Sequence, residues 1–137
     1  MKMIRKNNGS VLLIAVFAIS LMSVLTIGIV EMHTEEVQLM QNQVNAVQAL
    51  AVAEAGLNDA FAQIRASSSW TPDGSYTNKS FPGYGTYTVT REGSLPDPNI
   101  TSVGTTSLGF KARVKADITI GNSSPYVIRI DNLRINE

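Results

Sequence analysis

The residues that most often carry catalysis or bind metal are few in this chain and poorly placed. His33 is the only histidine, and Glu31 lies two positions before it. Residues two apart on a helix do not face each other, so this pair has poor metal-binding geometry. We therefore expect a solvated His33 and no metal ligands.

Candidate nucleophiles and bases also lack partners. The serines at 67–69 are more than thirty residues from His33, which is the only side chain of the type that usually activates a serine. Glu54 lies among alanines, and a pair with a strand cation such as Lys111 or Arg113, or a backbone cap, is more plausible than general acid chemistry. We predict no catalytic residue, no cofactor and no enzymatic activity.

Asp97 and Asn99 are the one pair of oxygen ligands that suggests calcium. Two such ligands fall short of the six to eight that calcium takes. The prolines that alternate with these residues already make a good turn. We interpret the segment as a turn.

Composition excludes further classes of function. The 137 residues suffice for one modest domain, and 11 basic residues balance 11 acidic ones. A balanced charge gives no reason to predict a nucleic acid partner. The absence of cysteine excludes disulfides, zinc–thiolate sites and thiol catalysis.

The N-terminal part of the sequence has the pattern of a membrane helix. A short basic leader, residues 1–9, ends at Gly9, and residues 10–30 contain no formal charge. A helix of this length matches the ~30 Å hydrocarbon core of a bilayer. Three cations precede the run (Lys2, Arg5, Lys6) and three glutamates follow it (Glu31, Glu35, Glu36), which predicts a cytoplasmic N-terminus.

A removable secretory signal is the first alternative for this segment. The apolar run is longer than the 7–15 residues of a typical signal core. The nearest small-x-small site, Ala51-Val52-Ala53, lies some twenty residues further on. We therefore expect the helix to stay with the protein.

The helical pattern continues through residues 31–66. Apolar residues recur at steps of three and four, which indicates one apolar stripe, and no proline occurs before Pro72. The serines at 67–69 and Pro72 should end the helix. We predict one helix over about 10–66, apolar on all sides in its first half and amphipathic in its second half.

Residues 67–137 should form an antiparallel sheet of about four strands. Alternation of apolar and polar residues predicts strands near 85–91, 100–105, 110–120 and 126–135, with a bulge or strand end at Asn132. The apolar face of such a sheet needs a cover, and residues 44–66 of the helix offer one. The predicted fold class is α+β, and the predicted helix–sheet core contains Val47, Leu57, Phe61, Ile64, Tyr87, Val89, Phe110, Val114, Ile118, Ile128 and Ile130.

This arrangement resembles the type IV pilins and pseudopilins. The leader that ends at Gly9 directly before an apolar helix is similar to a prepilin leader. The segment Ala53-Glu54-Ala55-Gly56 is similar to a segment of PilX-like minor pilins, and residues 85–90 followed by 100–105 resemble the strands of that group. The resemblance covers most of the chain.

The resemblance implies cleavage by prepilin peptidase between Gly9 and Ser10, and N-methylation of Ser10. It implies a structural subunit that waits in the inner membrane, in contact with lipid, with its C-terminal part outside. Its partners would then be other pilin subunits and the assembly platform of a pilus or type II secretion filament. Helix packing in the membrane and the filament would use Val11, Leu12, Ile14, Ala15, Ala18, Leu21, Leu25 and Gly28.

One departure from the family pattern carries information. Most pilins have a glutamate at the fifth mature position, where this chain has Ile14. That carboxylate is thought to neutralise the buried α-amine of an adjoining subunit, since an unpaired charge among apolar helices is costly. GspK-like tip pseudopilins also omit it, which suggests a minor subunit at or near a filament tip.

Two other functions stay open. The first is a single-pass, signal-anchored membrane protein whose external domain binds a partner unrelated to filaments. The second is a membrane-tethered enzyme, which would require a group of acid, base or metal ligands that the sequence lacks.

Overall fold

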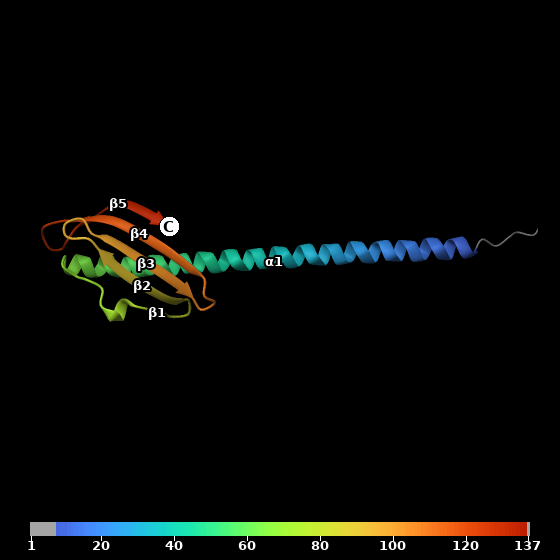
Figure 1. Cartoon of the computed structure of the whole chain (residues 1–137), viewed down its shortest axis with the longest axis horizontal. Coiled ribbons are helices and arrows are strands. Elements are labelled where there is room, and N and C mark those ends of the chain that lie inside the picture. The colour runs from blue at the N-terminus through green and yellow to red at the C-terminus, as the bar shows by residue number, and fades with distance from the viewer. Residues whose placement is uncertain (1–7, 137) are drawn as a thin grey trace, which may run out of the picture. The chain divides into compact units, whose positions relative to one another are not determined.

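The computed structural model describes residues 8–136 and contains one long helix followed by a five-stranded antiparallel sheet (Figure 1). This confirms the predicted α+β class. The chain divides into two compact units, Met1–Gln41 and Asn42–Glu137, and the helix contributes to both. The elements are α1 (Asn8–Ala66), the 3₁₀ turn η1 (Gly74–Tyr76), β1 (Lys79–Phe81), β2 (Gly85–Glu92), β3 (Asn99–Thr106), β4 (Lys111–Ile120) and β5 (Ile128–Ile135). Residues 1–7 of the expected leader lie outside the described residues.

The helix ends where the sequence predicts. Its last residue is Ala66, directly before the serine cluster. The backbone N–H of Ser67 donates to the carbonyl of Gln63 at 2.9 Å, and the N–H of Tyr126 donates to the carbonyl of Arg65 at 3.3 Å. These bonds satisfy carbonyl groups that have no partner within the last helical turn.

The strands follow one another in the order β1-β2-β3-β4-β5. Four of them match the predicted strands. The short β1 is additional, because it lies in a segment rich in turn residues and depends on its pairing with β2, from Lys79 opposite Tyr87 to Phe81 opposite Gly85.

The predicted irregularity in the last strand is confirmed. Along the β4–β5 pair, Asp117 lies opposite Asn132 whereas Ile118 lies opposite Ile130, so Asp131 has no counterpart. The extra residue explains why the apolar set changes phase from Ile130 to Leu133.

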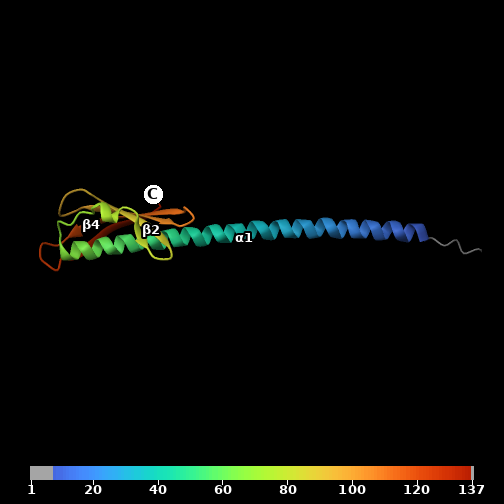
Figure 2. The same ribbon diagram turned by 90° about the horizontal axis from the view of Figure 1, so that it is seen from below.

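One face of the sheet packs on the second half of α1 (Figure 2). Alternate residues of β2, β3 and β4 are buried on this inner face, and the other face carries polar side chains. Burial of six predicted core residues is confirmed, and Phe61 and Ile128 pack on the core while partly buried. The six are Leu57, Ile64, Tyr87, Val89, Val114 and Ile118.

Three predicted core positions were wrong. Val47 is 66% exposed, because a different face of α1 contacts the sheet. Ile130 is 49% exposed, because it lies on the edge strand β5, where the helix gives little cover. Phe110 precedes β4 and is only half-buried.

The buried helix face is built mainly from small residues. The predicted stripe followed the larger apolar residues through Val44 and Val47, but Val44 is 56% exposed. Burial instead begins at Ala49 and follows steps of three and four, which together place these residues on one side of the helix. The fully covered helix residues are Ala49, Val52, Ala53, Gly56, Leu57, Ala60 and Ile64.

Two glycines bring this helix face close to the sheet. A Cβ atom on Gly104 of β3 would collide with backbone atoms of Ala49 and Ala53 in α1. A Cβ atom on Gly56 of α1 would lie 2.7 Å from the ring of Tyr87 and would also collide with the hydroxyl of Ser102. The missing side chains therefore set the separation of helix and sheet along this contact.

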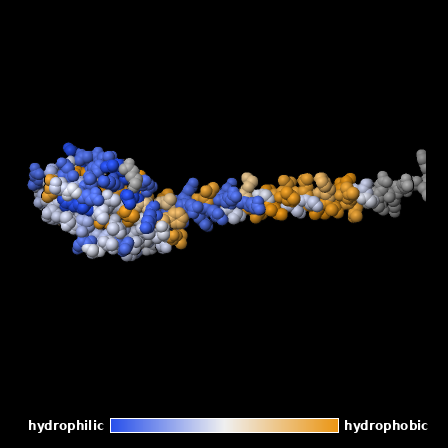
Figure 3. Space-filling model, viewed as in Figure 1, coloured by the Kyte–Doolittle hydropathy of each residue, from blue (hydrophilic) through white to orange (hydrophobic). Residues whose placement is uncertain are grey.

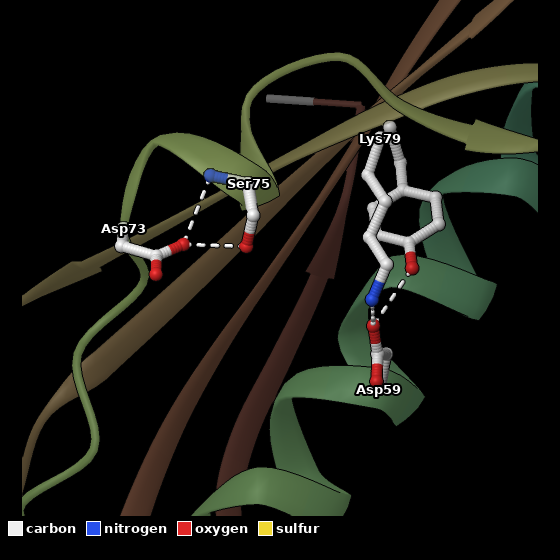
Figure 4. A network of polar contacts seen from close by, with 5 residues as sticks. Asp59, Asp73, Ser75 and Lys79 are labelled. Carbon is white, nitrogen blue, oxygen red and sulfur yellow. Dashed lines mark hydrogen bonds and ion pairs between the residues drawn. The ribbon is translucent and has the colours of Figure 1, made fainter.

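A polar cluster beside this contact joins α1 to β1 and β2. Lys79 Nζ lies 2.6 Å from Asp59 Oδ2, and the hydroxyl of Tyr87 donates to the same oxygen at 2.7 Å. Figure 4 shows the amine of Lys79 directed at the Asp59 carboxylate. The amine also lies 4.4 Å from the ring centroid of Tyr76. Neither the ion pair nor the cation–π contact has a signal in the local sequence.

The hydrogen bonds of the cluster change the pKa values of Asp59, Lys79 and Tyr87. Burial alone would raise the pKa of Asp59, but the hydrogen bonds from Lys79 and Tyr87 and the charge of Lys79 outweigh burial and leave that pKa below its usual value. The hydrogen bond to Asp59 raises the pKa of Lys79. Burial, followed by the Asp59 hydrogen bond, raises the pKa of Tyr87.

The segment that follows the helix is fixed by side chains. Asp73 caps η1 by accepting bonds from the backbone N–H and the hydroxyl of Ser75 at 2.9 and 2.5 Å (Figure 4). Arg91 donates to the carbonyl oxygens of Ser68 and Trp70. The Trp70 ring meets Tyr76 edge to face, with centroids 4.9 Å apart, so the single tryptophan reports on the packing of this unit.

Gly104→Ala should destabilise the helix–sheet unit by about 1–3 kcal/mol, because the added Cβ must push against helix backbone that cannot rotate away. The measurement is urea unfolding of the full chain in detergent micelles, followed by Trp70 fluorescence. Gly74→Ala is the matched control, because no atom lies within 4 Å of its Cβ position. Equal urea midpoints for Gly104→Ala and Gly74→Ala would show that β3 and the helix backbone have room for an added methyl group at Gly104.

Asp59→Asn should lower stability at neutral pH by about 1–2 kcal/mol, since it replaces a charge-assisted pair with a weaker bond at a partly exposed site. The folded pKa of Asp59 is lowered, so its contribution is complete above the unfolded pKa of about 3.9 and is lost as pH falls through the folded pKa. The melting temperatures of the wild-type protein and of Asp59→Asn, measured from pH 7 to pH 2, should therefore converge at the acid end. A constant difference over that range would contradict this assignment.

Candidate functional site

The first candidate site is the apolar helix surface, defined as residues 10–30 of α1. Its large side chains are exposed on all sides, from 51% for Leu21 to 71% for Leu13. Figure 3 shows this part of the helix as a nearly continuous apolar zone. The helix is long and apolar enough to cross a membrane, with a mean hydropathy of 2.6 over its most apolar stretch. A surface of this kind is unfavourable in water and suits lipid or other apolar helices.

Hydroxyl groups within this surface bond to the helix itself. The hydroxyls of Ser20, Ser23 and Thr26 donate to the carbonyl oxygens four residues earlier, at 2.8, 2.9 and 2.8 Å. In hydrocarbon no water could accept these protons, so the internal bonds make the three side chains compatible with a bilayer. The sequence alone does not indicate these bonds.

The predicted packing residues all lie on this exposed surface. Except for Leu12, they follow one another at steps of three and four and therefore lie on one side of the helix. Gly28 and the small residues Ala15 and Ala18 are also exposed, and no atom lies within 4 Å of the Cβ position of Gly28. The helix includes Gly9 and Ser10, and both are exposed. The predicted packing residues are Val11, Leu12, Ile14, Ala15, Ala18, Leu21, Leu25 and Gly28.

An acidic segment follows the apolar helix surface. His33 Nδ1 lies 3.6 Å from the carboxylate of Glu36, three residues later, and both side chains are largely exposed. Glu31 and Glu35 are one helical turn apart, and within residues 8–136 no ion pair includes either of them. Among the described residues no group of three or more His, Cys, Asp or Glu side chains could hold a metal ion.

The second candidate site is on the outer face of the sheet, away from the helix. A row of directly opposed residues crosses four strands: Thr90, Thr101, Lys115 and Arg134. These four, with Glu92, Val103 and Arg113, line an open groove of about 490 Å³, which we name the basic groove. Arg134 Nη2 pairs with Asp117 Oδ2 at 2.6 Å. The strand pattern predicts polar residues on this face, but only the register brings the cations together.

Glu54 does not join these cations, so one of its two interpretations, a pair with Lys111 or Arg113, was wrong. Lys111 and Arg113 alternate along β4 with residues buried against the helix, and therefore lie on the opposite face of the sheet. Glu54 is exposed on α1. It lies outside the true packing stripe.

The predicted turn residues near position 97 are tied to the sheet. Asp97 Oδ1 accepts a hydrogen bond from the hydroxyl of Thr119 at 2.9 Å, and Asn99 begins β3. The same hydroxyl lies 2.6 Å from Asp131 Oδ2 and 3.2 Å from Arg129 Nη2. Arg129 thus supplies positive charge beside these carboxylates.

Comparison with known proteins adds no relative. No protein-family model, curated protein or solved structure matches this chain. A functional assignment therefore depends on the sequence motifs and on the two surfaces described above.

Proposed function

We propose that this chain is a minor pilin or pseudopilin, a structural subunit of a type IV pilus or a type II secretion filament. The observation that carries the proposal is the division of α1. Its residues 10–30 are uncharged and exposed on every side, while residues 49–64 hold a buried face against the sheet. One helix thus serves two environments.

The exposed half of the helix must exchange one apolar environment for another in this proposal. Before assembly it lies in the inner membrane, with the N-terminus in the cytoplasm and the sheet outside. On assembly its lipid neighbours are replaced by helices of other subunits. Lipid tails are as apolar as leucine, so close packing at small residues such as Ala15, Ala18 and Gly28 must favour the exchange.

The leader junction supports the proposal independently. A basic segment ends at Gly9, and the uncharged run begins at Ser10. Prepilin peptidase would cut between these two residues, and the new N-terminus would be methylated. Both modifications are specific to this class of subunit, so they distinguish it from a general membrane anchor.

Ile14 supports a place at or near the tip of the filament. A subunit without a carboxylate at this position cannot neutralise the α-amine of a neighbour within the apolar helix bundle. A subunit of this kind fits best at the tip, where no further subunit has an α-amine that requires a carboxylate partner.

A single-pass, signal-anchored protein with an external binding domain is the main alternative. The apolar helix surface fits it equally well, because a span of this kind is also sufficient for an anchor. The two functions differ in the fate of the leader and not in the geometry of the helix.

Co-expression with prepilin peptidase should yield a mature chain that begins at N-methylated Ser10. Intact-mass and peptide mass spectrometry of the membrane fraction measure this directly. Gly9→Val is the matched control, because a branched side chain at the cleavage position should block processing without changing the helix beyond it. A chain that keeps residues 1–9 in the presence of an active peptidase would favour the anchor.

A further inference from the structure

The edge strand β5 leaves apolar side chains exposed on the inner face of the sheet. β5 pairs with β4 alone, and within residues 8–136 no strand pairs with its other edge (Figure 1). Ile130, Leu133 and Ile135 are 49%, 50% and 47% exposed, although the residues opposite them on β4 are at most 1% exposed. Directly opposed residues of an antiparallel pair lie on the same face. The inner face therefore continues past its cover at this edge.

The unpaired edge of β5 determines the kind of partner that fits it. A strand at the edge of a sheet presents a row of backbone N–H and C=O groups that can bond to another extended segment. Such a segment would also bring alternate side chains beside the exposed apolar residues, as β4 does on the other side. This edge therefore suits a strand better than a helix or a small molecule.

The sequence of β5 is symmetric about its centre. Read forward from residue 128 it is Ile-Arg-Ile-Asp, and read backward from residue 135 it is Ile-Arg-Leu-Asn. Two copies in an antiparallel pair, with a two-fold axis between Asp131 and Asn132, would therefore match apolar residues with apolar ones and polar residues with polar ones. Ile130 of one copy would lie opposite Leu133 of the second copy.

The irregularity in β5 favours a second copy over an unrelated strand. Asp131 is the extra residue of this strand relative to β4. The side chains of Asp131 and Asn132 consequently both lie on the outer face, near Thr119 and Asp117. A regular strand would lose its alternation at this point, and its apolar residues beyond it would face outward. A second copy has the same extra residue, so the two alternations stay matched along the whole strand.

The arginines of β5 do not prevent this pairing. Arg129 would lie opposite Arg134 of the second copy, and like charges in that position repel. Each arginine is already paired within its own copy: Arg129 Nε lies 2.6 Å from Asp131 Oδ1, and Arg134 Nη2 lies 2.6 Å from Asp117 Oδ2. These two ion pairs reduce the repulsion between the opposed arginines.

We propose that β5 binds the β5 strand of a second copy of this chain in antiparallel orientation, so that the two sheets join into one. The exposed apolar side chains of each copy then cover those of the other. The two-fold axis also reverses the direction of helix residues 42–66, so the pair brings two copies together from opposite directions. The inference concerns only the unit from Asn42 to Glu137, and it does not depend on the fate of the leader.

Cysteine cross-linking tests the pairing, since the chain contains no cysteine. The full-length chain is purified in detergent micelles, where no bilayer fixes the orientation of the copies. Asn132→Cys is exposed and lies beside the axis, so this variant should form a disulfide-linked dimer under mild oxidation. Asn122→Cys is the matched control, because it is also an exposed asparagine but lies in the turn before β5, away from the axis, and should give little dimer.

Two further variants test the register. Ile128→Cys and Ile135→Cys lie directly opposite each other in the proposed pair. Each is separated from the same position of the second copy by the length of the strand, about 23 Å. Differently tagged chains should therefore link when the two variants are mixed, and neither variant should link to itself when it is oxidised alone.

A charge on the inner face tests the apolar contact. Leu133→Lys, added to Asn132→Cys, should reduce the linked dimer about tenfold, because the axis places the change opposite Ile130 twice. Leu133 is half-exposed, so the unit should still fold, and urea unfolding followed by Trp70 fluorescence checks this. Mixing with chains that carry Ile130→Glu and Asn132→Cys should restore linkage through a Lys–Glu pair.

Several results would overturn the inference. Equal linkage of Asn132→Cys and Asn122→Cys would show random collision. Linkage of Ile128→Cys to itself would show a different interface. Linkage of Asn132→Cys in membranes to other proteins, and not to its own copies, would identify another strand as the occupant. The apolar helix surface is unchanged in every variant, so a dimer that does not respond to Leu133→Lys would be assigned to that surface.

Discussion

The close contact between the α1 backbone and β3 is the constraint on which the helix–sheet unit depends. Gly104 lies against the backbone at Ala49 and Ala53, and Gly56 lies against Tyr87 and Ser102. Contact at this distance requires small residues at the points of closest approach, which explains the glycine and the alanines on the buried helix face. Val44 and Val47 remain exposed because they lie on a different side of the helix. The van der Waals contacts of such an interface are individually small and effective only in number.

The polar cluster around Asp59 complements that contact. Apolar packing along α1 has little directional preference, whereas the hydrogen bonds of Lys79 and Tyr87 to one carboxylate oxygen require a particular rotation of the helix. The first of these residues lies on the short edge strand β1 and the second on β2. The cluster therefore fixes the helix to the beginning of the sheet, while β3 and β4 supply most of the buried residues of the sheet.

The two candidate surfaces suit different environments. The apolar helix surface carries no charged side chain, and the hydroxyls of Ser20, Ser23 and Thr26 bond within the helix, so this surface suits lipid or other apolar helices. The basic groove is polar and open, and it faces away from the helix.

The amino-acid sequence by itself determined the helix from its apolar start to Ala66, four of the five strands and the irregularity near Asn132. These features depend on local periodicity, on proline and on turn residues, all of which act over a few positions. Only the tertiary structure decided which side of the helix is buried, because the packing depends on two glycines, one in the helix and one in β3. It also decided β1, the Asp59–Lys79 pair and the basic groove, since each joins residues from different elements and none leaves a pattern within a single segment.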